Sequence, residues 1–176
     1  LRRFTYRYDK VDNLLSEVED PGDRKYRTDY RYDSNDNVVS RTDPRGFTEG
    51  GGPYAYQTQY AYDASDRLTA VRAPGIQTGF AAFQLSETRM TYYPSGLLKT
   101  IVKPKGVNTP GIAGDYTTSY EYDRNGFVTK VTLPRDADQY AFARTPAIDY
   151  GRNAVGDPVT VTDARGVVAT NEFFDT

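Results

Sequence analysis

The sequence predicts an all-β protein made of an array of antiparallel β-hairpins that form one curved sheet. Three observations lead to this prediction. The 176 residues include 16 Tyr and 8 Phe, and aromatic residues favour strands. A Tyr-x-Tyr-Asp pattern recurs along the chain. Residues alternate with period two around its copies, as in Thr58, Tyr60 and Tyr62, and no stretch shows a sustained helical period.

The composition excludes several classes of function. The chain has no Cys and no His, which excludes disulfides, thiolate nucleophiles, Ser-His-Asp triads and sulfur-based metal sites. A net charge of −2 argues against a strong nucleic-acid footprint. Apolar runs are too short to span a membrane. We therefore expect a protein that is not an enzyme and that needs no cofactor or metal.

The recurring pattern keeps a strict register. Its second position falls at residues 32, 62, 92, 122 and 152, a period of 30 residues, with shorter steps at both ends. A small or acidic turn residue follows four positions later. The motif residues are Tyr6, Tyr8, Asp9, Tyr30, Tyr32, Asp33, Tyr60, Tyr62, Asp63, Tyr92, Gly96, Tyr120, Tyr122, Asp123, Gly126, Tyr150 and Gly156.

This register predicts one repeat array over residues 1–176. Its units start near residues 4, 28, 58, 88, 118 and 148, with a partial unit from 170. The chain opens at Leu1-Arg2-Arg3 without a start Met, as a fragment of a larger protein would. We therefore expect the array to be part of a longer chain.

Each unit is expected to form one hairpin. The Tyr-x-Tyr segment forms the first strand, and Asp-x-x-Gly/Asp forms the turn because Asp caps local N–H groups and Gly tolerates positive φ. Apolar residues of opposite parity in the second strand predict a β-bulge. Pro then ends that strand and Gly lets the chain reverse. These corner residues are Pro44, Gly46, Pro74, Pro104, Gly106, Pro134 and Gly166.

The segments between a corner and the next Tyr strand carry about eight additional residues in the 30-residue units. They run over Phe47 to Gln57, Ile76 to Glu87, Val107 to Thr117 and Arg135 to Ala147. We expect them to extend the hairpins or to form longer loops at the rim of the sheet.

The repeat, read as Tyr-x-Tyr-Asp-x-x-Gly-x-Leu followed by a short strand and Asp-Pro-x-Gly, resembles the YD repeat of Rhs-type proteins. The clearest matches are Tyr30 to Gly46 and Tyr120 to Pro134, and the resemblance runs from about Phe4 to Asp175. It implies a strip of sheet that spirals into a hollow shell. Such shells enclose a C-terminal toxin in bacterial Rhs polymorphic toxins and in the B/C parts of Tc toxins, and a similar shell belongs to animal teneurins.

The resemblance implies a non-catalytic wall segment of a shell that encapsulates a C-terminal toxin before delivery. The implied partners are the remaining shell repeats and the enclosed polypeptide, and the implied location is a secreted or cell-surface bacterial protein. We also expect self-association through open sheet edges. The aspartyl autoprotease core of bacterial Rhs proteins is not found, so cleavage is carried over to no residue.

Four alternatives compete with this interpretation. The Tyr residues could form an adhesion or carbohydrate-binding surface, although packing across strands and between repeats explains their spacing better. The motif Asp residues could bind calcium, but counting twelve positions from Asp33 reaches Pro44 where an EF-hand needs Glu. No pair of carboxylates stands out as a glycosidase site. Arg residues such as Arg7 and Arg31 are interleaved with acids, so a solvated face is favoured over phosphate binding.

Overall fold

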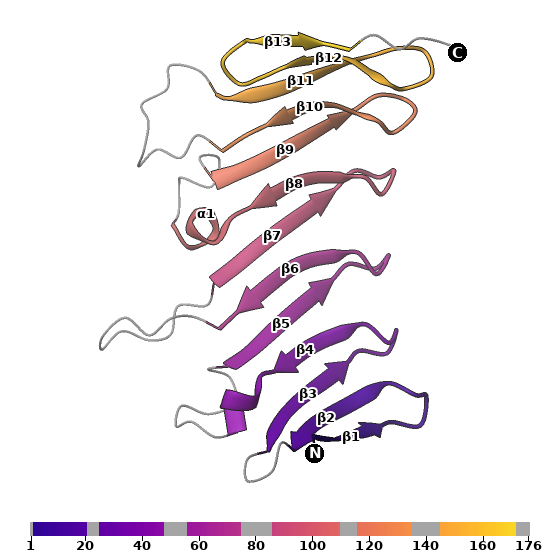
Figure 1. Ribbon diagram of the computed structural model, residues 1–176, viewed down its shortest axis with the longest axis vertical. Helices are drawn as coiled ribbons and strands as arrows, with labels where there is room; N and C mark the ends of the chain where they lie inside the picture. Colours follow the sequence, from indigo (N-terminus) through magenta and orange to yellow (C-terminus); the bar gives the residue numbers. More distant parts are fainter. Residues whose placement is uncertain are drawn as a thin grey trace. The chain divides into compact units, whose positions relative to one another are not determined.

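The computed structural model describes residues 2–20, 25–47, 56–74, 86–109, 116–134 and 145–171. The strands in these ranges form an open sheet of 13 strands, and their order in the sheet is their order along the chain (Figure 1). The chain divides into two compact units, residues 1–87 and 88–176. The all-β array of antiparallel hairpins that the sequence predicts is therefore confirmed.

The first unit contains six complete strands and one short helical turn. The strands are β1 (Arg3–Tyr8), β2 (Leu14–Asp20), β3 (Tyr26–Tyr32), β4 (Val38–Thr42), β5 (Gln57–Tyr62) and β6 (Leu68–Ala73). The helical turn η1 (Pro44–Phe47) follows β4, and β7 (Ser86–Tyr92) begins at the end of this unit.

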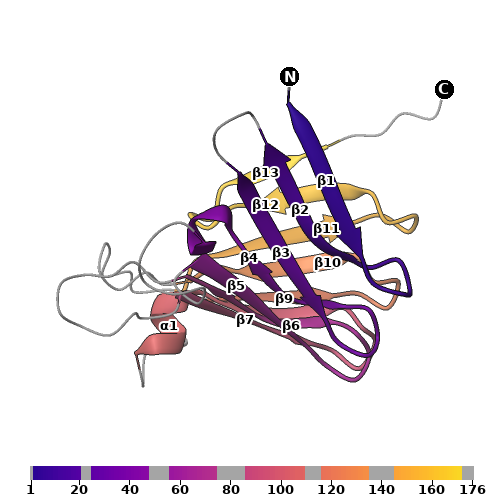
Figure 2. The same cartoon turned by 90° about the horizontal axis from the view of Figure 1, so that it is seen from below.

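The second unit repeats the same hairpin. Its strands after β7 are β8 (Leu98–Val102), β9 (Thr117–Tyr122), β10 (Val128–Thr132), β11 (Ala147–Arg152), β12 (Pro158–Thr162) and β13 (Val168–Thr170). The short helix α1 (Pro104–Asn108) follows β8 in the place that η1 occupies after β4. In each unit the helical turn lies at the end of the strands opposite to the tight hairpin turns (Figures 1 and 2).

The predicted bulge is present in all six hairpins that begin with a Tyr-type strand. In the first, Tyr8 faces Leu14 and Arg7 faces Ser16, so Leu15 is an extra residue on the second strand. The same shift occurs in the pairs β3–β4, β5–β6, β7–β8, β9–β10 and β11–β12. The extra residue explains why the apolar positions of the second strand change parity.

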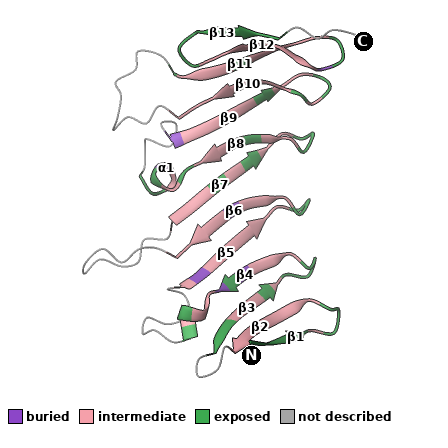
Figure 3. Ribbon diagram, viewed as in Figure 1, coloured by how far each residue is buried: buried purple, intermediate pink, exposed green. Residues whose placement is uncertain are grey.

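The fold has little sealed interior, because a single layer of sheet leaves both faces accessible. Most strand residues are half-buried and most turn residues are exposed (Figure 3). The buried apolar residues among those described are Ala70 and Tyr116, and the buried polar ones are Ser40, Thr42 and Gln57. None of the described helices is long and apolar enough to cross a membrane. Stability must therefore come largely from contacts between successive hairpins.

Candidate functional site

The seam between one hairpin and the next is the feature that recurs through the array. The second strand of each hairpin pairs with the first strand of the next, as in Ser16 opposite Asp29 and Ser40 opposite Gln59. Positions are counted from the second motif residue, so Leu14 is the sixth and Ser16 the eighth position after Tyr8. Pairing across the seam ends at the eighth position. The carbonyl at the sixth position lies beyond this ladder and needs another donor.

Motif tyrosines of the following hairpin supply that donor in the first unit. The Tyr32 hydroxyl donates to the Leu14 carbonyl at 3.0 Å, and the Tyr62 hydroxyl donates to the Val38 carbonyl at 3.0 Å. Burial raises the pKa of both hydroxyls, so they stay protonated donors at neutral pH. The second Tyr of the motif thus ties its hairpin to the one before it.

Other side chains take over this role where the motif departs from Tyr. Arg152 stands at the second position of its unit, and its Nε donates to the Val128 carbonyl at 3.1 Å. Its guanidinium also lies over the Phe127 ring, 5.3 Å from the centroid. After β12, Asn171 Nδ2 donates to the Pro158 carbonyl at 3.0 Å. At four seams, a side chain therefore donates a hydrogen bond to the sixth-position carbonyl, and the donors are of three residue types: Tyr, Arg and Asn.

The aspartate that follows the second motif residue caps its own turn. Asp9 Oδ1 accepts from the N–H groups of Val11 and Asn13, both at 2.9 Å. The N–H of Asn13 is the largest cause that lowers the pKa of Asp9. Asp33, Asp63, Asp123, Asn153 and Asp163 make the same pair of contacts. The chain then passes through a residue with left-handed φ. A turn that ends in such a residue is typical of the three-residue loops of hairpins.

Neighbouring turns of the first unit are linked by amide–carboxylate hydrogen bonds. Asn13 Nδ2 donates to Asp36 Oδ1 at 2.6 Å, and Asn37 Nδ2 donates to Asp66 Oδ1 at 2.7 Å. Each bond joins the fifth position of one hairpin to the fourth position of the next. Asp36 and Asp66 have φ values of 62 and 58, so these acids occupy a backbone region that favours Gly.

The same two positions meet in the second unit with different chemistry. The fourth position is Gly126 or Gly156, and the fifth position of the preceding hairpin is Leu97 or Phe127. A β-carbon at Gly126 would lie 3.8 Å from Leu97 Cδ1, and one at Gly156 would clash with the Phe127 ring. An apolar side chain over a glycine thus replaces the Asn–Asp bond.

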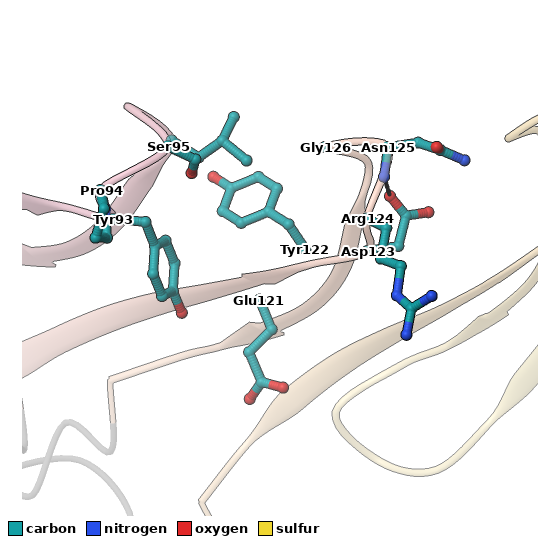
Figure 4. Close-up of a pocket in the computed structure, with 10 residues that line it drawn as sticks. Tyr93, Pro94, Ser95, Glu121, Tyr122, Asp123, Arg124, Asn125 and Gly126 are labelled. Carbon is teal, nitrogen blue, oxygen red and sulfur yellow. Dashed lines mark hydrogen bonds between the residues drawn. The ribbon is translucent and has the colours of Figure 1, made fainter.

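Tyr93 occupies the position where the other turns have Asp or Asn. Its hydroxyl donates to the Tyr120 carbonyl at 3.0 Å, and its ring meets the Tyr122 ring edge-on with 6.1 Å between centroids. An open hollow of ≈ 830 Å³ lies between the turn of this hairpin and the turn of the next one. Glu121 and Arg124 also line it (Figure 4). Burial raises the pKa of Tyr122.

The Pro-x-Gly corners that the structure describes are helical turns. Gly46 lies in η1 and Gly106 in α1, and neither has positive φ, so the chain reverses at these corners through a helical turn. The basic residue of each corner lies over an aromatic ring that precedes the next strand. Arg45 is 5.1 Å from the centroid of Tyr56, and Lys105 is 5.1 Å from that of Tyr116.

The remaining predicted residues fall into three groups. Gly166, predicted as a corner, lies in the tight turn between β12 and β13 with φ 88. Pro74 follows β6 and Pro134 lies just beyond β10, while most of the inserted segments fall outside the described residues. The first tyrosines, Tyr6, Tyr30, Tyr60, Tyr120 and Tyr150, face Glu17, Arg41, Val71, Val131 and Val161.

The sequence predicts that the tyrosine rings pack across strands and between neighbouring repeats. Ring contacts among the described residues include one within a strand, between Phe4 and Tyr6, and one between hairpins, between Tyr93 and Tyr122. The fifth-position residues were not identified from the sequence, because they vary in type from Asn to Phe. Among the described residues, no cluster of three or more acidic groups is placed to hold a metal ion.

One family model and several solved structures match the chain. A family model described as RHS Repeat matches residues 8–48. The crystal structure of TcdB2-TccC3 without its hypervariable C-terminal region matches with a TM-score of 0.60 and 14% identity, over 89% of this chain and 7% of that chain. A second TcdB2-TccC3 crystal structure matches at 15% identity with a TM-score of 0.45, over 91% and 10%. The Photorhabdus luminescens Tc holotoxin pore matches at 14% identity with a TM-score of 0.42, over 91% and 10%.

No curated protein matches the chain by sequence. This chain spans 7% of the length of the protein chain that it matches in the first of those structures. At 14% identity, the likeness concerns the fold alone. The matched repeat begins at Tyr8, runs through Asp33 and the β3–β4 hairpin, and ends just after η1. Residues 8–48 therefore match the RHS Repeat family model, and the same hairpin with a capped turn recurs through the other described ranges of the chain.

Proposed function

We propose that this chain is a non-catalytic wall segment of a Rhs-type shell that encloses a C-terminal toxin polypeptide before delivery. The observation that carries the proposal is the seam. At four seams, a side chain of the following hairpin or strand satisfies a backbone carbonyl that the ladder leaves free. The motif residues are thereby engaged in joining repeats, which is what a wall requires and what a catalytic site does not.

The chemistry of the described side chains supports a mechanical role. The motif aspartates bond to their own turns, and the pKa values of Asp9, Asp33 and Asp63 are lowered, whereas a general acid at neutral pH needs a raised pKa. The partners under this proposal are further shell repeats and the enclosed polypeptide. The parent protein would then be secreted or displayed by a bacterium as part of a toxin complex.

The native protein that contains this chain provides the test. It would be purified from its source with an antibody against residues 25–47, imaged by electron microscopy and treated with protease before and after denaturation. We expect a hollow particle and an internal fragment that is cleaved after denaturation only. A particle without a lumen, or a fully accessible polypeptide, would overturn the proposal.

A second candidate function, adhesion or carbohydrate binding, is favoured by the hollow beside Tyr93. Two rings, the Glu121 carboxylate and the Arg124 guanidinium line it, and sugars bind to surfaces that combine rings with polar groups. A glycan array would be probed with the wild-type chain and with Tyr93→Asp, which restores the turn residue of the other repeats. Strong hits that this variant loses would support binding, whereas an array without hits would exclude it.

A further inference from the structure

The turn between β9 and β10 contains the one Asn–Gly pair of the sequence, Asn125-Gly126. Gly126 has a φ of 85, a region that L side chains rarely adopt, so the fold favours glycine at this place. The Asn125 side chain is exposed and extends outward from the turn (Figure 4). Because glycine has no β-carbon, the backbone nitrogen that follows Asn125 is sterically accessible to the Asn125 carboxamide.

The carboxamide of Asn125 also lacks the hydrogen bonds that hold most other asparagines. It has no partner among the described residues, and only the backbone N–H of Asn125 is engaged, as a donor to Asp123 Oδ1 at 2.9 Å. None of the other six asparagines precedes glycine. Five of those six donate from Nδ2 to a carboxylate or a carbonyl, namely Asn13, Asn35, Asn37, Asn153 and Asn171. Exposure, a free carboxamide and a following glycine therefore coincide at Asn125.

We propose that Asn125 is a site of spontaneous deamidation, a covalent modification that needs water alone as co-reactant. The Gly126 nitrogen attacks Cγ of Asn125, and the new N–C bond closes a five-membered succinimide ring. The proton of that nitrogen leaves with the Nδ2 group as ammonia. Water then opens the ring. Cleavage between the nitrogen and Cγ gives aspartate, whereas cleavage between the nitrogen and the main-chain carbonyl carbon gives isoaspartate, whose backbone runs through Cβ and Cγ.

The turn itself controls the rate of this reaction. The Gly126 N–H donates to the Asp123 carbonyl at 3.1 Å, and this bond must open before the nitrogen can attack. The Asp123 carboxylate holds the turn closed, because it accepts from the N–H groups of Asn125 and Phe127, both at 2.9 Å. Deamidation therefore proceeds from a locally opened turn, at a rate that follows the opening equilibrium.

Isoaspartate at this position disrupts the capped turn. It adds a backbone atom between Asp123 and Phe127, so the N–H of Phe127 moves away from the carboxylate that caps it. Phe127 also contacts the next turn, because its ring fills the space of a β-carbon at Gly156 and lies 5.3 Å from the guanidinium carbon of Arg152. The modification therefore loosens the contact between two turns as the protein ages, whatever the array encloses.

Ageing of the full chain at neutral pH tests the modification. Deamidated sites would be located by peptide mapping with mass spectrometry and by labelling with an isoaspartyl methyltransferase. We expect Asn125 to convert ahead of every other asparagine, and Asp123→Ala to accelerate its conversion about fivefold because the open turn is favoured. Asn125→Ser is the control without a carboxamide, since Ser65 and Ser95 stand at the same turn position. No isoaspartate at Asn125, or equal conversion at another asparagine, would overturn the proposal.

A second Asn–Gly pair in the first unit separates the effect of the free carboxamide from that of the glycine. Asp36→Gly creates this pair at Asn35, whose Nδ2 donates to Asp66 at 2.9 Å, and the φ of 62 at Asp36 suits glycine. We expect Asn35 in this variant to convert at least about fivefold more slowly than Asn125. Addition of Asp66→Gly frees the Asn35 carboxamide and should bring the two rates together. Equal rates in the single variant would show that the free carboxamide does not select Asn125.

The structural consequence is tested on the product. The aged chain, enriched in isoaspartate, would be compared by amide exchange with Asn125→Asp, which has the same charge and an ordinary backbone. We expect the N–H of Phe127 to exchange at least about fivefold faster with isoaspartate, and at nearly the wild-type rate in Asn125→Asp. Equal exchange in the two forms would overturn the inference that isoaspartate loosens the turn.

Discussion

At the scale of single residues, the hydroxyl of the second motif Tyr has a role that the first Tyr of the same strand lacks. Tyr62 donates to Val38 across the seam, whereas Tyr60 on the same strand faces Val71. We expect Tyr62→Phe to lower the free energy of unfolding by about 1 kcal/mol, because the Val38 carbonyl loses its donor. Tyr60→Phe serves as the matched control and should change it by less than about 0.5 kcal/mol. Urea denaturation checks this, and equal effects of the two substitutions would contradict it.

Two separate physical reasons favour glycine at the fourth turn position, and a comparison of Gly96 with Gly156 separates them. Gly96 and Gly156 both have positive φ, but only at Gly156 does a neighbour, the Phe127 ring, fill the space of a β-carbon. We expect Gly96→Ala to destabilise by about 1–2 kcal/mol through the backbone alone. Gly156→Ala should lose a further 1–3 kcal/mol or so from overpacking. The additional destabilisation by Gly156→Ala should be smaller in a Phe127→Ala background, which a double-mutant cycle measured by denaturation can determine. An additional loss of the same size in both backgrounds would contradict the overpacking explanation.

At the scale of the element, four of the tight turns are held by an aspartate whose pKa is lowered, namely Asp9, Asp33, Asp63 and Asp163. For Asp9 the N–H of Asn13 is the largest cause, and for Asp63 and Asp163 it is the side chain of Arg67 or Arg165. A carboxyl with a lower pKa in the folded state stabilises the fold above its unfolded value of 3.8 and loses this effect as the pH falls through the folded value. The array should therefore unfold more easily as the pH falls below about 4.

Asn153 shows how that acid response can be dissected. Its Oδ1 accepts the same two N–H groups as the aspartates do, without a titratable group. We expect Asp33→Asn to keep the turn nearly intact at pH 7 and to reduce the loss of stability on acidification. Thermal unfolding of wild type and variant at pH 7 and pH 3 makes the comparison. An identical acid response would show that the Asp33 carboxylate does not contribute to it.

The elements differ in how far the sequence could predict them. The hairpins, the capped turns and the bulge follow from local spacing, because residues such as Asp33 and Asn37 act within one turn. The helical corners at Pro44 and Pro104 were missed, since four or five residues are too few for a helical period. The contacts between neighbouring turns were also missed, because Asn13 with Asp36 and Phe127 with Gly156 share a geometry and no residue type.

At the scale of the whole molecule, the seams make each hairpin depend on its neighbours. A hairpin alone is marginally stable in water, and a strand inside the array has a partner on both sides. In the first unit, β4 pairs with β3 and β5, and it contains the buried residues Ser40 and Thr42. The strand β1 pairs with β2 alone and has no buried residue. Stability should therefore vary along the unit, as it does in other arrays of repeats.

Native-state amide exchange tests this gradient directly. Within the first unit we expect the ladder amides of β4 and β5 to exchange at least about tenfold more slowly than those of β1, because opening β1 breaks one strand pairing and opening β4 breaks two. The Tyr62→Phe variant should speed exchange in β4 and β5 without changing β1, since the bond from Tyr62 to Val38 joins their hairpins. Uniform rates from β1 to β6 would instead indicate that the unit opens as a single cooperative block, and the repeat-by-repeat account would be wrong.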